Sequence, residues 1–132
     1  MNPFQTPGAM SWAELMTSDA EAAVRFYGEL LGWQMKGMPM EGMGTYHVCS
    51  VPGHDDQPIG GICNRPPQEA SQPPAWGVYA TVADVEATAA RCTALGGTVC
   101  AAPFDVPGVG RMAVLQDPQG AVFQVMQYEM PA

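Results

Sequence analysis

The chain has 132 residues, 47% of them hydrophobic, and a net charge of −8. A chain this acidic repels phosphate groups, which disfavours nucleic-acid binding and attachment to anionic membranes. Its length predicts one domain, and no apolar run approaches the roughly 20 residues that a membrane-spanning helix needs. The start of the chain lacks the basic and apolar regions of a signal peptide, and the four cysteines form no CxxC pair. We expect a cytoplasmic protein with reduced thiols.

The first half of the chain predicts a strand, a helix and three further strands. The opening strand is SWAELMT, at 11–17. A helix follows, because Ser18 and Glu21 fit a capping box and apolar residues then recur at helical spacing. Gly32 can take the left-handed conformation that ends such a helix. Strand candidates separated by turn residues come next, at 33–38, 45–51 and 58–63.

The second half repeats this order after a proline-rich connector. Residues 64–75, NRPPQEASQPPA, hold four prolines and show no apolar periodicity, so they predict a link between two parts. A strand candidate at 76–82 leads into a helix within 83–97. Three strand candidates follow, at 98–102, 111–116 and 121–128, the last two joined by the turn sequence DPQG.

The two halves match each other at a fixed offset of 65 positions. Five identities occur without a gap: Asp19 with Asp84, Glu21 with Glu86, Ala22 with Ala87, Leu30 with Leu95 and Gly32 with Gly97. We infer a duplicated βαβββ unit, with modules 11–63 and 76–128 in a single domain, 1–132. Each helix covers one face of its sheet, and the other face must meet a second sheet. The sequence therefore predicts an α+β fold whose two modules pack into an open, curved mixed β-sheet around a cleft.

Three segments resemble the glyoxalase/bleomycin-resistance/extradiol-dioxygenase superfamily, also called vicinal oxygen chelate. They are WAELMTSDAEAAVRFYGELLGW, YATVADVEATAARCTALGG and PGVGRMAVLQDPQGAVFQVMQ, and together they span most of 11–128. The resemblance implies paired βαβββ modules around a concave site, and often a dimer. It also implies several activities, because the superfamily holds metal-dependent isomerases, dioxygenases, thiol transferases, epimerases and metal-free drug-binding proteins.

The metal-binding positions that the resemblance implies carry unsuitable side chains here. A His or Gln usually stands seven residues before the Asp that opens each helix, where this chain has Trp12 and Gly77. A Glu usually follows the DPxG turn, where this chain has Gln124. A divalent ion needs several carboxylate or imidazole ligands, so we expect no metal and no cofactor. A site built from Glu14, His47 and one further ligand remains the alternative, with His54 in a loop.

Alternation along the strands then predicts a ligand-binding wall. Tyr79 shares the face of Gly77, and Met126 shares the face of Gln124. The resemblance adds the residues three and five before Asp117 as lining. The expected wall is Trp12, Tyr79, Met112, Val114 and Met126, with Glu14 and Gln124 as polar points.

Each polar or aromatic candidate also has a structural interpretation. Trp12 either fills the space of the lost ligand or forms a stacking floor for a flat compound. Glu14 is either a solvated or hydrogen-bonded carboxylate, or a general base or anchor for a cationic group. Arg111 is either a solvated charge at the rim or a group that holds an anion.

The leading hypothesis is a metal-free small-molecule-binding protein that holds an aromatic or cationic compound in an apolar cleft. The alternative is a lyase, isomerase or dioxygenase-type enzyme of the same superfamily, with a divalent metal or with Glu14 as general base. A third is an interaction module whose sheets pair to make a homodimer.

Overall fold

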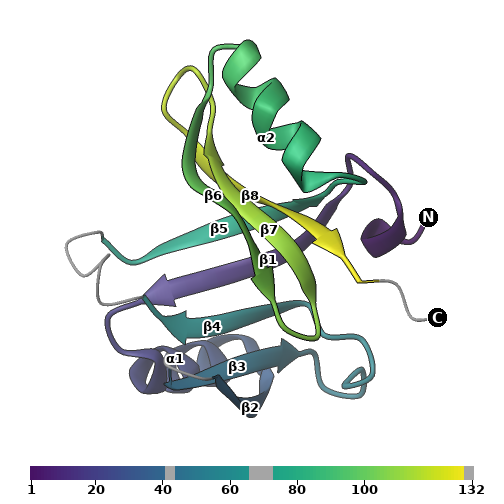
Figure 1. Ribbon diagram of the computed structural model, residues 1–132. Coiled ribbons are helices and arrows are strands. Elements are labelled where there is room, and N and C mark those ends of the chain that lie inside the picture. The colour runs from purple at the N-terminus through teal and green to yellow at the C-terminus, as the bar shows by residue number, and fades with distance from the viewer. Residues whose placement is uncertain (41–43, 66–72, 130–132) are drawn as a thin grey trace. The chain divides into compact units, whose positions relative to one another are not determined.

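A computed structural model describes residues 1–40, 44–65 and 73–129. The chain forms two compact units. We call Ala13–Gly77 the N-unit, and Val78–Ala132 together with Met1–Trp12 the C-unit. The elements, in chain order, are η1 (Pro3–Gln5), β1 (Met10–Thr17), α1 (Ala20–Leu31), β2 (Gln34–Met40), β3 (Gly44–Ser50), β4 (Gly60–Asn64), β5 (Ala75–Thr81), α2 (Val85–Ala94), β6 (Thr98–Val106), β7 (Gly110–Gln116) and β8 (Val122–Tyr128) (Figure 1).

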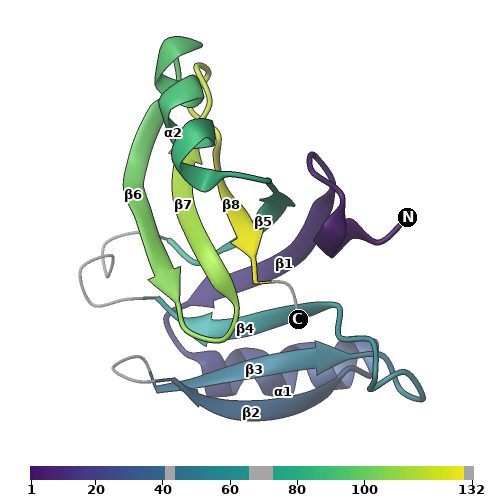
Figure 2. The ribbon, with the colours of Figure 1, turned by 45° about the vertical axis from the view of Figure 1, so that its right-hand side comes forward.

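The strands of the N-unit lie in the order β2-β3-β4-β1, with β1 and β4 parallel and the other pairs antiparallel. The helix α1 covers one face of these strands (Figures 1 and 2). The predicted helix is confirmed, but Asp19, not Ser18, caps it: its carboxylate accepts a hydrogen bond from the Ala22 amide at 3.1 Å. Gly32 ends the helix as predicted, with φ at +74°.

The core of the N-unit is small. Leu15, Ala20, Cys49 and Ile62 are buried between α1 and the strands. Among the apolar residues of α1, Tyr27 packs against this core, whereas the side chain of Leu30 is 64% exposed. The helical spacing therefore predicted the helix correctly and overstated how much of its apolar surface is buried.

The strands of the C-unit repeat the same arrangement, in the order β5-β8-β7-β6. Here β5 and β8 are parallel and the other pairs antiparallel, so the C-unit matches the N-unit strand for strand. Asp84 caps α2 through the Ala87 amide, again at 3.1 Å. The positive φ after α2 falls on Gly96, the first of the two glycines that end this helix, and Gly97 is the one that matches Gly32 at the offset of 65. The core here contains Val85, Ala89, Ala113, Leu115 and Val125.

The predicted α+β class and the two βαβββ modules are confirmed, while the cleft between the modules stays a prediction. The strand β6 runs to Val106, although the expected strand ends at 102. Residues 66–72 of the predicted connector lie outside the described residues; β4 ends at Asn64 and β5 begins at Ala75. Among the described residues, no helix has both the length and the apolar content for a membrane crossing.

Candidate functional site

The strands of the C-unit carry an apolar cluster on the face that α2 leaves free. Since side chains alternate along a strand, the residues between those packed against α2 point to this other face. Tyr79, Met112 and Met126 are each at most 6% exposed. Partly buried neighbours complete what we call the helix-free cluster, and these are Trp12, Val106, Val114 and Tyr128.

Gln124 lies within the same face. In the sheet register it stands opposite Tyr79 on one side and Val114 on the other. Its side-chain oxygen, Oε1, is buried and accepts no hydrogen bond from any described residue. Burying such an acceptor without a partner costs about 1–3 kcal/mol. This oxygen can therefore gain from a bound molecule that donates an N–H or O–H group.

The N-terminal segment packs against one end of the helix-free cluster. The ring of Phe4, in the turn η1, lies edge-on to Tyr128 at 5.1 Å and 6.3 Å from the ring of Trp12. The Tyr128 hydroxyl is 2.6 Å from the hydroxyl of Ser11. The Thr81 hydroxyl donates to the backbone carbonyl of Pro3, also at 2.6 Å. These contacts hold the N-terminal turn in place beside the aromatic side chains.

Arg111 is engaged by two carboxylates. Its Nε lies 2.6 Å from Glu86 and its Nη1 lies 3.0 Å from Asp105. The hydrogen bond with Glu86 and then the one with Asp105 raise the pKa of the guanidinium further above its usual value. With two acidic partners, this side chain is poorly suited to hold an anionic ligand.

Glu14 belongs to the N-unit, on the face of its strands that α1 leaves free. Its side chain is buried, and it stands opposite Gly61 of β4, a glycine covered by the ring of Tyr46. Burial and, after it, the negative charge of Glu14 raise the pKa of the Cys63 thiol to about 12. That thiol is therefore protonated near neutral pH and is a poor nucleophile.

His47 lies on the opposite face of the same strands. It stands opposite Ile62, which packs under α1, and its Nε2 is 3.3 Å from the carboxylate of Glu21 in that helix. Glu14 and His47 therefore cannot ligate one ion together, which removes the alternative metal site considered from the sequence. His54 lies in the exposed stretch between β3 and β4.

Comparison with known proteins adds to this geometry. The family model for the Glyoxalase/Bleomycin resistance protein/Dioxygenase superfamily matches residues 9–125. The chain belongs to this superfamily. It is 41% identical over 120 residues to CFP32 of Mycobacterium tuberculosis, a protein provisionally named a glyoxylase. That match covers 91% of this chain and 44% of CFP32.

A second relative of this superfamily member is the anthracycline biosynthesis protein DauV of a Streptomyces species. The identity is 35% over 128 residues, covering 90% of this chain and 46% of DauV. The chain therefore spans about half the length of the curated relatives it matches.

Solved structures share the fold of this superfamily member. Methylmalonyl-CoA epimerase from Mycobacterium tuberculosis matches with a TM-score of 0.63 and 14% identity, over 96% of this chain and 92% of that one. A variant of the Streptomyces coelicolor epimerase, in complex with 2-nitronate-propionyl-CoA, matches with a TM-score of 0.66 and 17% identity. It covers 95% of this chain and all of the epimerase.

The metal that many members of the superfamily use does not fit the residues at its implied positions. Trp12 and Gly77 supply no suitable donor atom, and the neutral amide of Gln124 is a weak ligand on its own. Among the described residues, no three His, Cys, Asp or Glu side chains lie close enough to hold an ion together.

The structure brings six of the seven expected wall residues together in the C-unit: Trp12, Tyr79, Met112, Val114, Gln124 and Met126. Glu14 lies in the other unit. Sequence reasoning missed Phe4 and Tyr128. Tyr128 had a usable signal, because it follows Met126 at the spacing of two that keeps a strand residue on the same face. Phe4 had none.

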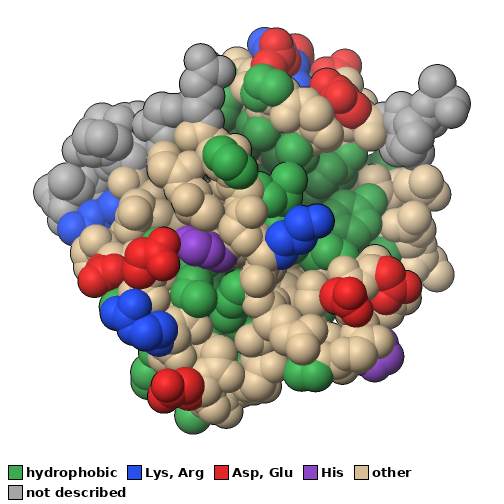
Figure 3. Space-filling model, turned by 90° about the horizontal axis from the view of Figure 1, so that it is seen from below, with side chains coloured by type: hydrophobic (Ala, Val, Ile, Leu, Met, Phe, Trp, Pro, Cys, Tyr) green, Lys and Arg blue, Asp and Glu red, His purple; other side chains and the backbone are tan. Residues whose placement is uncertain are grey.

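The surface charge of the protein gives little selectivity between charged ligands. Figure 3 shows acidic and basic side chains together on one face of the molecule. The net charge of the chain is −8, which favours solubility in general and gives no specific ligand preference.

Proposed function

We propose that this protein binds a flat, largely apolar small molecule against the helix-free cluster of the C-unit, without a divalent metal. The observation that carries the proposal is the buried, unpartnered Oε1 of Gln124 within an apolar face. A bound compound with one N–H or O–H group in its plane would satisfy this oxygen. The surrounding rings and methionines suit a flat ligand, because aromatic faces stack and thioethers adapt their shape.

The relatives support an aromatic ligand. DauV of Streptomyces, and DnrV of Streptomyces peucetius, are named anthracycline biosynthesis proteins. Anthracyclines carry a flat, hydroxylated ring system, which has the shape and the donors that the face around Gln124 would accept. We therefore propose a hydroxylated polycyclic aromatic compound as the ligand class. A positive charge elsewhere on the ligand would agree with the acidic surface.

A matched pair of ring compounds tests this proposal. 2,6-Dihydroxyanthraquinone offers O–H donors, and its dimethyl ether keeps the ring system without them. We expect quenching of tryptophan fluorescence by the diol at lower concentration than by the ether. The Gln124→Leu variant should bind both equally, and EDTA should change nothing. If neither compound binds, or if EDTA abolishes binding, the proposal fails.

A buried carboxylate favours a second candidate, an enzyme of the same superfamily. Glu14 lies buried on a sheet face and would act as general base for a lyase or isomerase. The fold neighbours that are methylmalonyl-CoA epimerases suggest proton abstraction beside a carbonyl.

Deuterium exchange tests this second candidate. Methylmalonyl-CoA incubated with the protein in heavy water would gain deuterium, with and without added Mn²⁺ or Fe²⁺. Glu14→Gln should abolish the exchange, and Glu29→Gln, on the exposed side of α1, should leave it unchanged. Absence of exchange under every condition removes this candidate for that substrate.

We further propose a homodimer in a reducing, cytoplasmic setting. Module pairing across subunits is common in the superfamily, and all four cysteines are free, two of them buried. Light scattering after size exclusion tests the dimer; a mass of one chain would contradict it.

A further inference from the structure

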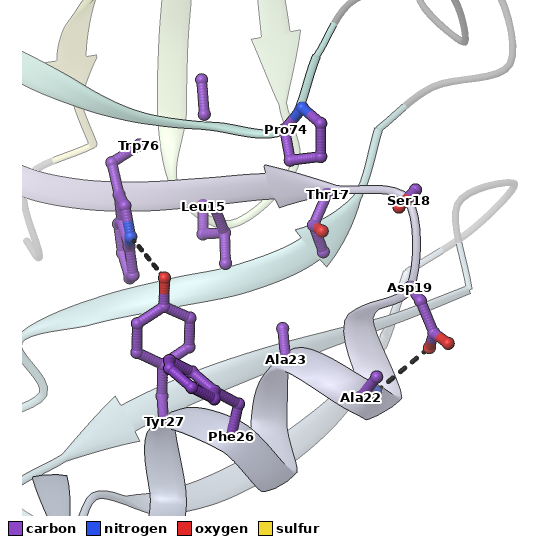
Figure 4. A pocket seen from close by; sticks show the side chains of 11 residues that line it. Leu15, Thr17, Ser18, Asp19, Ala22, Ala23, Phe26, Tyr27, Pro74 and Trp76 are labelled. Atoms are coloured by element: carbon purple, nitrogen blue, oxygen red, sulfur yellow. Dashed lines mark hydrogen bonds between the residues drawn. The ribbon is translucent and has the colours of Figure 1, made fainter. Parts of the chain in front are cut away.

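A groove runs along α1 in the N-unit and is lined only by residues of that unit. Its volume is about 430 Å³, which lies in the range of small-molecule sites. Side chains of α1 form one wall, and β1 with the start of β5 forms the other (Figure 4). The lining residues that the argument uses are Asp19, Phe26, Tyr27, Pro74 and Trp76.

One end of the groove is an aromatic wall whose rings hold one another in place. The Trp76 indole Nε1 donates to the Tyr27 hydroxyl at 3.1 Å, as the dashed line in Figure 4 marks. The Tyr27 ring stacks on Trp33 at 5.7 Å and meets Trp76 and Phe26 edge-on, at 5.4 and 5.1 Å. Trp76 and Phe26 nevertheless stay 41% and 58% exposed. Large aromatic side chains that are fixed and yet exposed are typical of binding surfaces.

The other end of the groove carries a negative charge. Among the described residues that line the groove, Asp19 is the charged one. Its Oδ1 accepts from the Ala22 amide, and the Asn64 side chain accepts from the Ala20 amide at 2.8 Å. The Ala20 and Ala22 amides at the N-terminus of α1 thus already have hydrogen-bond acceptors, so they do not need a bound anion. Within the part of the chain that the structure describes, the second carboxylate oxygen of Asp19 accepts no hydrogen bond, so it can pair with a ligand.

We propose that this groove is a binding site for a small organic cation with an aromatic ring at one end and an ammonium group at the other. Asp19 and Phe26 are seven residues apart, or about 10 Å of helix rise. Side chains of a helix lean toward its N-terminus, which brings the Phe26 ring nearer to Asp19. The ring of the ligand would pack on Phe26 and Trp76 at one end of the groove, and its ammonium would pair with Asp19 at the other.

Three probes with one ring and one chain length separate charge from apolar contact. They are 3-phenylpropylamine, 3-phenylpropan-1-ol and 3-phenylpropanoate. The readout is the Trp76 indole N–H signal in ¹⁵N-labelled protein, assigned with Trp76→Phe. We expect the amine to shift this signal at a concentration at least about tenfold below that needed for the alcohol, with the carboxylate weaker still.

Two matched variants test the charge. Asp19→Asn keeps a good helix cap while it removes the carboxylate, and it should bring the amine down to the affinity of the alcohol. Asp84→Asn makes the same change at the equivalent cap of α2 and should leave amine binding unchanged. Phe26→Ala should weaken all three probes.

Several outcomes overturn the proposal. These are equal binding of the three probes, no binding of any of them, or equal losses in Asp19→Asn and Asp84→Asn. A dimer that Phe26→Ala breaks, with amine binding unchanged, would instead make this surface a subunit interface. The anthraquinone assay reports on the other unit, so either proposal can fail while the other stands.

Discussion

Asp19 and Asp84 occupy equivalent places in the two modules, and each accepts a hydrogen bond from the amide three residues on, at 3.1 Å in both cases. Two residues that lie 65 positions apart in the sequence thus cap their helices with the same geometry. The internal likeness of the two halves is therefore structural as well as sequential.

Removal of one cap should cost a defined amount of stability. Asp84→Ala leaves the Ala87 amide without its acceptor, so we expect the free energy of unfolding to fall by about 1 kcal/mol. Urea denaturation followed by circular dichroism measures it. Asp84→Asn is the control, because an amide oxygen caps nearly as well. An equal loss in the two variants would show that charge, not capping, is what matters at this position.

The unpartnered Oε1 of Gln124 predicts a substitution that stabilises the protein. Gln124→Leu keeps the size of the side chain and removes the buried acceptor, so the free energy of unfolding should rise by about 1 kcal/mol in the absence of ligand. Thermal and urea denaturation measure the change. Gln127→Leu on the same strand should instead lower stability, since Gln127 accepts from the Val85 amide at 2.9 Å. A less stable Gln124→Leu would mean that this oxygen has a partner.

Close contact between Gly61 and Tyr46 predicts a steric penalty. A Cβ added at Gly61 would overlap the Tyr46 ring. We expect Gly61→Ala to lower the free energy of unfolding by about 1–3 kcal/mol, a range typical of overpacked sites. In the double variant that combines Gly61→Ala with Tyr46→Ala, the total loss of stability should be smaller than the sum of the losses in the two single variants. If the two stability losses simply add, the penalty at Gly61 does not come from its contact with Tyr46.

Thiol reactivity should separate the four cysteines. Burial raises the pKa of Cys49 to about 11 and, with Glu14 as the second cause, that of Cys63 to about 12. Iodoacetamide at pH 8 should therefore label the exposed Cys100 far faster than these two, as mass spectrometry of the folded protein would show. Rapid labelling of Cys63 before unfolding would contradict the assigned burial.

The same pKa shifts give a sign for the dependence of stability on pH. A thiol whose pKa is raised on folding keeps its proton in the folded chain while the unfolded chain begins to lose it near pH 9. Stability should therefore fall as the pH rises from about 9 toward 12. Urea midpoints between pH 8 and 10 measure the loss, and Cys49→Ala should reduce its slope. A midpoint that rises over this range would contradict the shifts.

The fold was predictable because it depends on local signals that occur twice. Helix caps, glycine stops and strand alternation each act within a few residues, and the repeat places them in order. The strand β6 shows where such signals mislead. Pro103 made an end near 102 reasonable, yet β6 continues because its pairing register shifts between Ala101 and Phe104, and because it is an outer strand of its unit.

The candidate site was predictable only in part, because local sequence patterns do not encode contacts between residues far apart in the chain. Alternation placed Tyr79, Met112 and Gln124 on one face, since that rule acts within each strand. Alternation did not predict on which face of the sheet His47 lies. The pairing of His47 with β4 and its contact with α1 show that it lies on the helix side. The pairing of Tyr27 with Trp76 joins residues 49 positions apart, and no local pattern encodes it.

The strand β1 has a consequence for how the chain can be divided. Its first three residues belong to the C-unit and its last five to the N-unit. The Gly8 amide donates to the Thr81 carbonyl and the Ala9 carbonyl accepts from the Thr81 amide, so the N-terminal dozen residues complete the half that is encoded last. One boundary between the two compact units therefore falls inside β1, and a fragment that begins at the second repeat would lack the N-terminal residues that pair with Thr81.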